Sequence, residues 1–239
     1  MTNRRVTAAS AIVLAIAFNI PFSILGATYD YPDVLRRPAG EALDLFAAGG
    51  GGLILTWHAF ALTALFFAPV GIALSITRER IQTRPMLAIG AAIFAALAGL
   101  AQAIGLWRWV FVIPGLARVH ADPRATNDAS LAAERAFEIL NQYGGVAIGE
   151  HLGQLLTAAF VATLALLQAG EGSRVTAPIG FVTALAIALG TGEGLAIALG
   201  QSGEKFALIT IAGFAGLTVW LIASGVTILR TRNASEAAS

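Results

Sequence analysis

Six apolar runs divide this chain, and each is long enough to cross the hydrocarbon core of a membrane. A spanning helix needs about 20 apolar residues, and the runs cover residues 6–29, 52–77, 86–113, 145–168, 175–199 and 206–229. Of the 239 residues, 57% are hydrophobic and 12% are charged, proportions far from those of soluble domains. The sequence therefore predicts one all-α domain, residues 1–239, built as a polytopic bundle of about six transmembrane helices with a flexible C-terminal tail over 230–239.

Basic residues indicate how these spans are oriented, because arginine and lysine accumulate in cytoplasmic loops. With the N-terminus inside, that side carries only three glutamates beside its eight arginines, which are Arg4, Arg5, Arg78, Arg80, Arg84, Arg174, Arg230 and Arg232. The other side has longer loops and more acidic than basic residues. We therefore expect both termini to be cytoplasmic. The net charge of +1 provides no basic field for binding nucleic acid.

Two stretches of the chain resemble each other. Residues 39–66 and 133–160 align without a gap, which places Gly50-Gly51 opposite Gly144-Gly145. This pattern predicts a duplicated helical hairpin, a device that several transporter folds use, and the alternative is chance similarity between two alanine- and glycine-rich strings. In each repeat a short amphipathic helix precedes the descending span, most clearly over 129–143, and we expect these helices to lie on the outer face.

Polar side chains inside the predicted spans mark a candidate site, since an ionisable group in hydrocarbon is costly. Counted at about 1.5 Å per residue, five such residues lie roughly 7 to 10 Å below the outer boundary: His58, Arg108, Glu150, His151 and Glu193. Three neutral residues extend this set, namely Gln154 one turn along, and Asn19 and Gln102 at greater depth. We expect an outer-leaflet pocket for a small ligand or transported solute, with Arg108 holding an anionic group and Glu150 or Glu193 carrying protons.

Other interpretations use the same residues. His58 and His151, at matched depth on different helices, could ligate a b-type haem or, with Glu150 and Glu193, a divalent metal, although no HExxH-type spacing supports a metal site. Alternatively, Arg108 could pair with a glutamate in a bundle that holds no ligand. The chain could also be a homo-oligomer or an accessory subunit of a larger membrane complex. No catalytic motif indicates an enzyme, and the absence of cysteine excludes thiol chemistry.

Three segments carry a resemblance to a known family. They are Phe18-Asn19, YDYPDVLRRP at 29–38 before a glycine run, and GEHLGQLLTAAF at 149–160. Together they resemble a bacterial family of small multi-helix membrane proteins that is classed only as a domain of unknown function. The resemblance covers nearly the whole chain and implies a location in the bacterial inner membrane. It implies no activity, cofactor or site residue.

Overall fold

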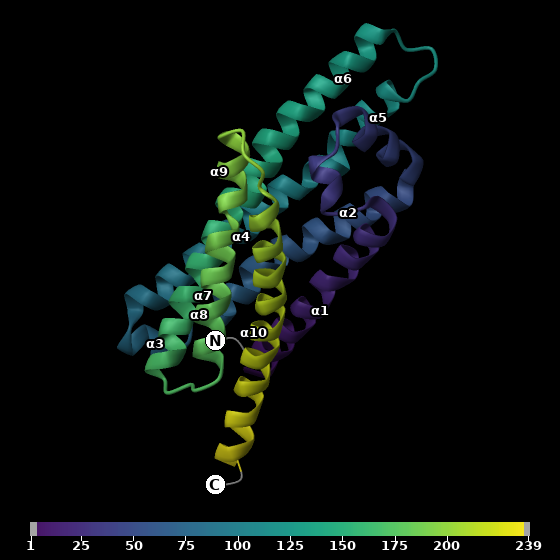
Figure 1. Ribbon diagram of the computed structural model, residues 1–239. Coiled ribbons are helices and arrows are strands. Elements are labelled where there is room, and N and C mark those ends of the chain that lie inside the picture. The colour runs from purple at the N-terminus through teal and green to yellow at the C-terminus, as the bar shows by residue number, and fades with distance from the viewer. Residues whose placement is uncertain (1–3, 237–239) are drawn as a thin grey trace.

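The computed structural model describes the backbone of residues 4–236 and the side chains of residues 4–230. Every regular element within this range is helical, and the long helices run side by side (Figure 1). In chain order the elements are α1 (Arg4–Tyr29), η1 (Asp33–Arg36), α2 (Ala39–Ser75), α3 (Arg78–Thr83), α4 (Pro85–Phe111), α5 (Ile113–His120), α6 (Asn127–Leu140), η2 (Asn141–Leu152), α7 (Gly153–Gly170), α8 (Thr176–Gly190), α9 (Gly192–Ala198) and α10 (Glu204–Glu236).

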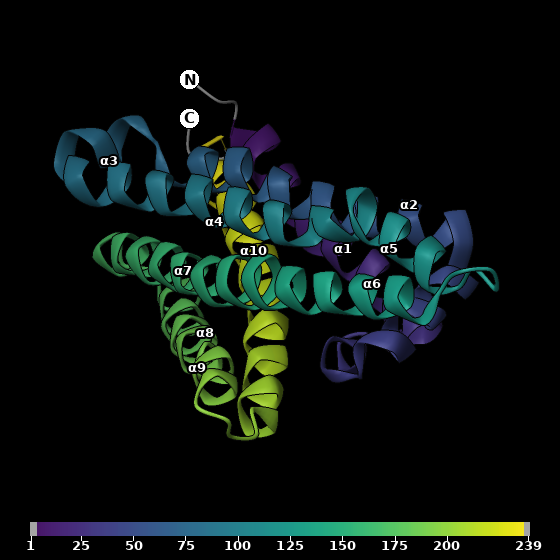
Figure 2. The ribbon, with the colours of Figure 1, turned by 90° about the horizontal axis from the view of Figure 1, so that it is seen from above.

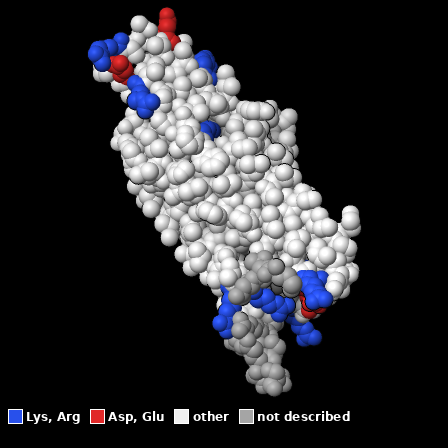
Figure 3. Space-filling view, turned by 180° about the vertical axis from the view of Figure 1, so that it is seen from behind, with Lys and Arg blue, Asp and Glu red and all other residues white. Residues whose placement is uncertain are grey.

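Within the described residues, six helical stretches are long and apolar enough to cross a membrane. They are Arg4–Tyr29, Ala39–Ser75, Pro85–His120, Asn127–Gly170, Thr176–Ala198 and Glu204–Arg230. On the face shown in Figure 3, charged side chains gather at the two ends of the molecule, and the broad band between them is almost free of charge. The predicted all-α bundle with six membrane spans is therefore confirmed.

The spans form a closed ring whose order follows the chain. α1 packs against α2, α2 against α4, α4 against α7, α7 against α8 and α8 against α10, which in turn packs against α1. Seen from above, α6 and α7 form one continuous row (Figure 2). We call the end that holds α5 and α9 the η1 end. The opposite end holds α3, the start of α1 and the end of α10, and is called the α3 end (Figure 1).

Breaks in two spans fall at the glycines that the repeat aligns. Gly50 has φ +58° and interrupts α2, a conformation that glycine adopts at little cost. In the second hairpin, η2 is a π-helix that contains Gly144 and Gly145. Instead of the expected interfacial helix at 129–143 followed by a new span, α6, η2 and α7 are continuous. The matching positions of the two breaks agree with a duplicated hairpin.

The other end of the chain also differs from the expected boundaries. The backbone of α10 continues to Glu236, well into the range 230–239 for which a flexible tail is expected. The last three residues, 237–239, lie outside the described part of the chain.

Two hydrophobic clusters fill the bundle at different depths. The alanine cluster has four alanines of α4 at its centre (Ala88, Ala91, Ala95 and Ala98) together with Phe160, Leu164 and Trp220. The aromatic cluster, nearer the η1 end, contains Tyr29, Phe46, Trp57, Phe60, Trp109 and Phe137. Beside the aromatic cluster lies a cavity.

Candidate functional site

The cavity occupies the part of the ring nearest the η1 end and has a volume of about 230 Å³. Its walls come from α1, η1, α2, α4, η2, α7, α9 and α10. Aromatic and polar residues line it together with aliphatic residues and glycines. The aromatic residues are Phe18, Phe22, Tyr31, Trp57, Phe60, Trp109 and Phe214, and the polar or charged ones are Asn19, Asp33, Arg36, Gln102, Arg108, Glu150, Gln154, Glu193 and Thr210.

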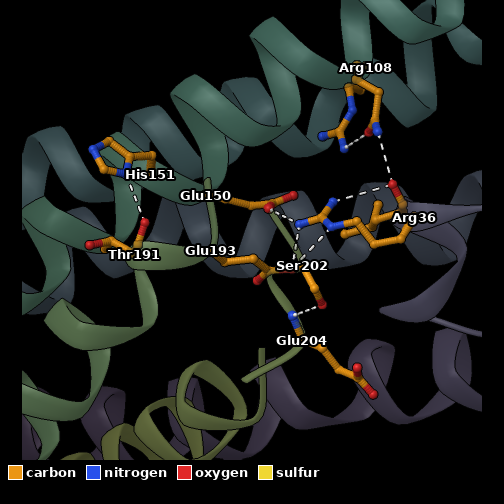
Figure 4. Close-up of polar contacts among 10 residues, drawn as sticks. Arg36, Arg108, Glu150, His151, Thr191, Glu193, Ser202 and Glu204 are labelled. Atoms are coloured by element: carbon orange, nitrogen blue, oxygen red, sulfur yellow. Dashed lines mark hydrogen bonds and ion pairs between the residues drawn. The ribbon is translucent and has the colours of Figure 1, made fainter. Parts of the chain in front are cut away.

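Arg36 joins three separate elements at the cavity. It lies in η1, the short helix that follows the turn from α1, and its Nη2 atom donates to Glu150 Oε2 of η2 and to Glu193 Oε1 of α9, both at 2.8 Å (Figure 4). Burial opposes the charge of Arg36 and would lower its pKa, but the two carboxylates outweigh this effect and raise the pKa above the usual range for arginine. The charged form of Arg36 therefore holds η1, η2 and α9 together.

Arg108 is the second cation of the site and has no carboxylate partner. Its side chain donates from Nη1 to the Gly105 carbonyl and from Nη2 to Asn141 Oδ1 at 2.9 Å. Asn141 in turn donates to the Leu35 carbonyl at 3.1 Å. Arg108 is only 8% exposed, so its charge is stabilised by neutral groups and by the ring of the adjacent Trp109, whose centroid lies 5.1 Å from the guanidinium carbon.

Three glycines allow the backbones around Arg108 to come close. A Cβ atom at Gly145 would lie 2.7 Å from Arg108 Cζ, so any side chain there would displace the guanidinium. A Cβ at Gly105 of α4 would lie 2.6 Å from the Cα of Gly149 in η2. Small residues at such contacts are typical of closely packed membrane helices. The π-helix and α4 therefore meet backbone to backbone beside the site.

The aromatic wall is a rigid array of rings. Trp57 and Trp109 stack with centroids 4.9 Å apart at 10°, and Tyr31 meets the edge of Trp57 at 5.2 Å. Phe18 and Phe60 continue the wall at 5.2 Å. Burial raises the pKa of Tyr31 above its usual value, so its hydroxyl is protonated at neutral pH. The cavity thus has one flat, apolar side and one charged side.

Several residues that line the cavity carry polar atoms without a partner. Among the described side chains, the buried atoms without a hydrogen bond include Trp57 Nε1, Trp109 Nε1, Arg108 Nε, Glu150 Oε1 and Thr210 Oγ1. Buried polar groups are normally hydrogen-bonded to protein, water or ligand. Three of these five atoms are donors only, which favours a partner that supplies acceptors.

Six of the eight predicted ligand-binding residues line this cavity. They are Asn19, Gln102, Arg108, Glu150, Gln154 and Glu193. Two of them also bond to neighbouring helices, since Asn19 donates to Thr218 Oγ1 at 3.0 Å and Gln102 to Thr157 Oγ1 at 2.7 Å. The alternative in which Arg108 pairs with a glutamate does not match the geometry, because Arg36 takes both carboxylates.

The two histidines do not line the cavity. His151 Nδ1 lies 3.1 Å from the Thr191 carbonyl (Figure 4), and His58 Nδ1 is buried without a partner among the described residues. In this part of the chain, no group of three or more His, Cys, Asp or Glu residues is placed to hold a metal ion. The haem and metal interpretations of His58 and His151 thus gain no support from the arrangement.

Arg36 and the aromatic wall were missed by reasoning from sequence. In the sequence Arg36 falls between two predicted spans, whereas the cost of burying charge in hydrocarbon marks only polar groups within the spans. The sequence did contain one indication of a further cation. Glu150 and Glu193 lie at one depth in the spans, and Arg108 alone cannot balance two negative charges. Trp57 and Trp109 resemble interface anchors in the sequence, and only the fold shows that both are fully buried.

The family described as "Domain of unknown function (DUF4386)" matches residues 6–225. No curated protein and no solved structure matches the chain.

Proposed function

Since this chain belongs to the DUF4386 family, whose function is unknown, we propose from the geometry that it is a multi-pass membrane protein that binds a small amphipathic molecule. One observation carries the proposal. The cavity between α1, α2, α4, η2 and α10 combines an aromatic wall with a charged side that contains unpaired polar atoms.

The charges around the cavity favour a ligand without a large net charge. Arg36 and Arg108 are matched by Glu150 and Glu193, and Asp33 adds one further carboxylate, so the formal charge of the lining residues is small. The unpaired donors of Arg108, Trp57 and Trp109 favour acceptor oxygens on the ligand. A flat or aliphatic body against the rings, with a carbonyl, ester or carboxylate head toward Arg108, fits both sides of the cavity.

Ligand binding can be measured through the unfolding temperature of the protein in mild detergent. The test compounds are short-chain quinones, medium-chain fatty acids and aromatic carboxylates, which share an apolar body and acceptor oxygens. A compound that binds only the folded state raises the unfolding temperature, and above Kd the rise grows with the logarithm of its concentration. We expect at least one class to produce such a concentration-dependent rise.

A matched pair of variants tells cavity binding from detergent-like partitioning. Leu106→Phe adds volume at a residue that lines the cavity, whereas Leu97→Phe makes the same change on α4 at a side chain that is 46% exposed. The thermal response should be lost in Leu106→Phe and kept in Leu97→Phe. An equal response in both variants, or no response in the unchanged protein, would contradict the proposal.

We also infer that the η1 end faces the outside of a bacterial inner membrane. Support comes from the arginine-rich α3 end, which agrees with the accumulation of basic residues in cytoplasmic loops. The chain has no cysteine, so single cysteines can report the orientation. Ala121→Cys, beyond α5, should react with an impermeant maleimide in intact cells, and Thr83→Cys, in α3, should react only after lysis. The reverse pattern would overturn this orientation.

A further inference from the structure

A second cavity lies at the α3 end and is independent of the function proposed above. It has a volume of about 820 Å³. Its walls come from the start of α1, the end of α2, α3, the end of α7, the α7–α8 connection and residues 224–228 of α10. The two cavities share no lining residue.

Arginine dominates the charge of this second cavity. Arg4, Arg78, Arg80 and Arg174 line it, against Glu79 and Glu171. Only one of these cations is neutralised, because Arg80 pairs with Glu171 through Nη2 and Oε2 at 2.7 Å and also donates to the Leu74 carbonyl. Among the described side chains, none forms an ion pair with the other three arginines.

The floor of the cavity is polar and already ordered. Gln168 of α7 donates to Ser224 of α10 at 3.1 Å, and Gln168 accepts from Trp220 at 3.2 Å. The hydroxyls of Ser173 and Thr176 lie 2.7 Å apart at the start of α8. Ser173 and Thr176 flank Arg174. The bonds of Arg80 to Glu171 and to the Leu74 carbonyl tie α3, which begins at Arg78, to the α7–α8 connection and to α2.

We propose that the cavity at the α3 end binds the phosphate group of an anionic molecule. Guanidinium groups match phosphate oxygens with paired hydrogen bonds, and three such groups lack a carboxylate partner here. The volume accommodates a phosphate together with the group that it is attached to. The phosphate belongs either to the headgroup of an anionic lipid or to a water-soluble anion, and the two sources differ in how they reach the site.

Binding is tested on the full chain in detergent by measuring the unfolding temperature with each source. One arm adds inorganic phosphate or pyrophosphate at constant ionic strength, and the other adds dioleoylphosphatidylglycerol, with dioleoylphosphatidylcholine as the zwitterionic control. The variant Arg78→Gln/Arg174→Gln removes two of the unpaired cations. Since each basic residue contributes about fivefold to the binding of anionic lipid, the double variant should bind about thirtyfold more weakly.

Two further variants separate a site from general charge effects. Arg78→Lys/Arg174→Lys keeps the charge but loses the paired hydrogen bonds of the guanidinium groups, so its binding should lie between that of the unchanged protein and that of Arg78→Gln/Arg174→Gln. Arg124→Gln removes one cation from the η1 end, where the Arg124 side chain is 91% exposed, and should change nothing. The proposal is overturned if neither source stabilises the unchanged protein, or if Arg78→Gln/Arg174→Gln responds as the unchanged protein does.

Discussion

The alanine cluster and the aromatic cluster occupy different depths of one bundle and differ in how closely the helix backbones approach one another. Beside the alanine cluster, where α2 packs against α4, small residues let the two backbones touch, and a Cβ at Gly99 would lie 2.8 Å from the Ala64 carbonyl oxygen. In the aromatic cluster the rings of Tyr29, Trp57 and Trp109 stand between the helices, with centroids 4.9 to 6.1 Å apart.

The difference shows how the bundle divides stability from binding. Close backbone contact maximises packing between membrane helices, for which water supplies no hydrophobic driving force. Large rigid rings cannot fill every space between themselves, and the unfilled space is the cavity. We therefore expect substitutions in and beside the alanine cluster to affect stability most and substitutions around the cavity to affect binding.

The largest effect is expected from a methyl group at Gly99, in the contact between α2 and α4 beside the alanine cluster. Gly99→Ala places its Cβ against the Ala64 carbonyl and within 3.0 Å of the Ala68 nitrogen, so α2 and α4 must separate. The free energy of unfolding should fall by about 3 kcal/mol, the upper range for overpacking, as measured by denaturant titration in mixed micelles.

Gly90→Ala is the matched control, because nothing lies within 4 Å of a Cβ at Gly90 of the same helix. It should leave stability unchanged or raise it by up to about 1 kcal/mol, since alanine favours helix over glycine. Equal losses in the two variants would refute the account of the contact between α2 and α4 as a close-contact interface.

A smaller loss is expected when the cation at the cavity is removed. Arg36→Ala leaves Glu150 and Glu193 as neighbouring unpaired carboxylates and should cost about 2 kcal/mol at neutral pH, less than a fully buried pair because Arg36 is partly exposed. The loss should be measured by the same titration, with Arg37→Ala, whose side chain pairs with Asp30 at 2.6 Å, as the surface control.

The pH dependence of this loss follows from the raised pKa of Arg36. Because the folded-state pKa is raised, the contribution of the Arg36 charge is fully present at neutral and mildly alkaline pH and is lost only as strongly alkaline solution is reached. The difference in unfolding free energy between the unchanged protein and Arg36→Ala should therefore be the same at neutral and at mildly alkaline pH, and a difference that falls within this range would refute the ion-pair explanation.

The smallest effect compares two threonines. Thr157 donates to the Gly153 carbonyl at 2.8 Å and accepts from Gln102 at 2.7 Å, so Thr157→Val should cost about 1 kcal/mol. Thr210 lines the cavity with an unpaired hydroxyl, and Thr210→Val should cost nothing in the empty protein. A substantial loss from Thr210→Val in the same titration would show that its hydroxyl already has a partner.

The spans and the depth of the site could be predicted from sequence because both depend on the bilayer. Hydrocarbon thickness fixes the length of a span, and the cost of burying charge directs Glu150 and Glu193 inward. The π-helix could not be predicted, because its glycine-rich sequence fits a loop equally well. Arg36 could not be predicted because its loop folds back over the ends of the spans, which the sequence does not show. Trp57 could not be assigned to the cavity because aromatic residues favour membrane interfaces as well as cores.

The closed ring of spans has a consequence for biosynthesis. Each helix from α1 to α8 can be placed beside its predecessor as the chain is inserted, but the contact between α10 and α1 forms only after α10 has been inserted. Because α1, α2, α4 and α10 all contribute to the first cavity, a chain that lacks α10 in the membrane has no complete cavity. The cavity is therefore enclosed only once α10 has taken its place in the ring.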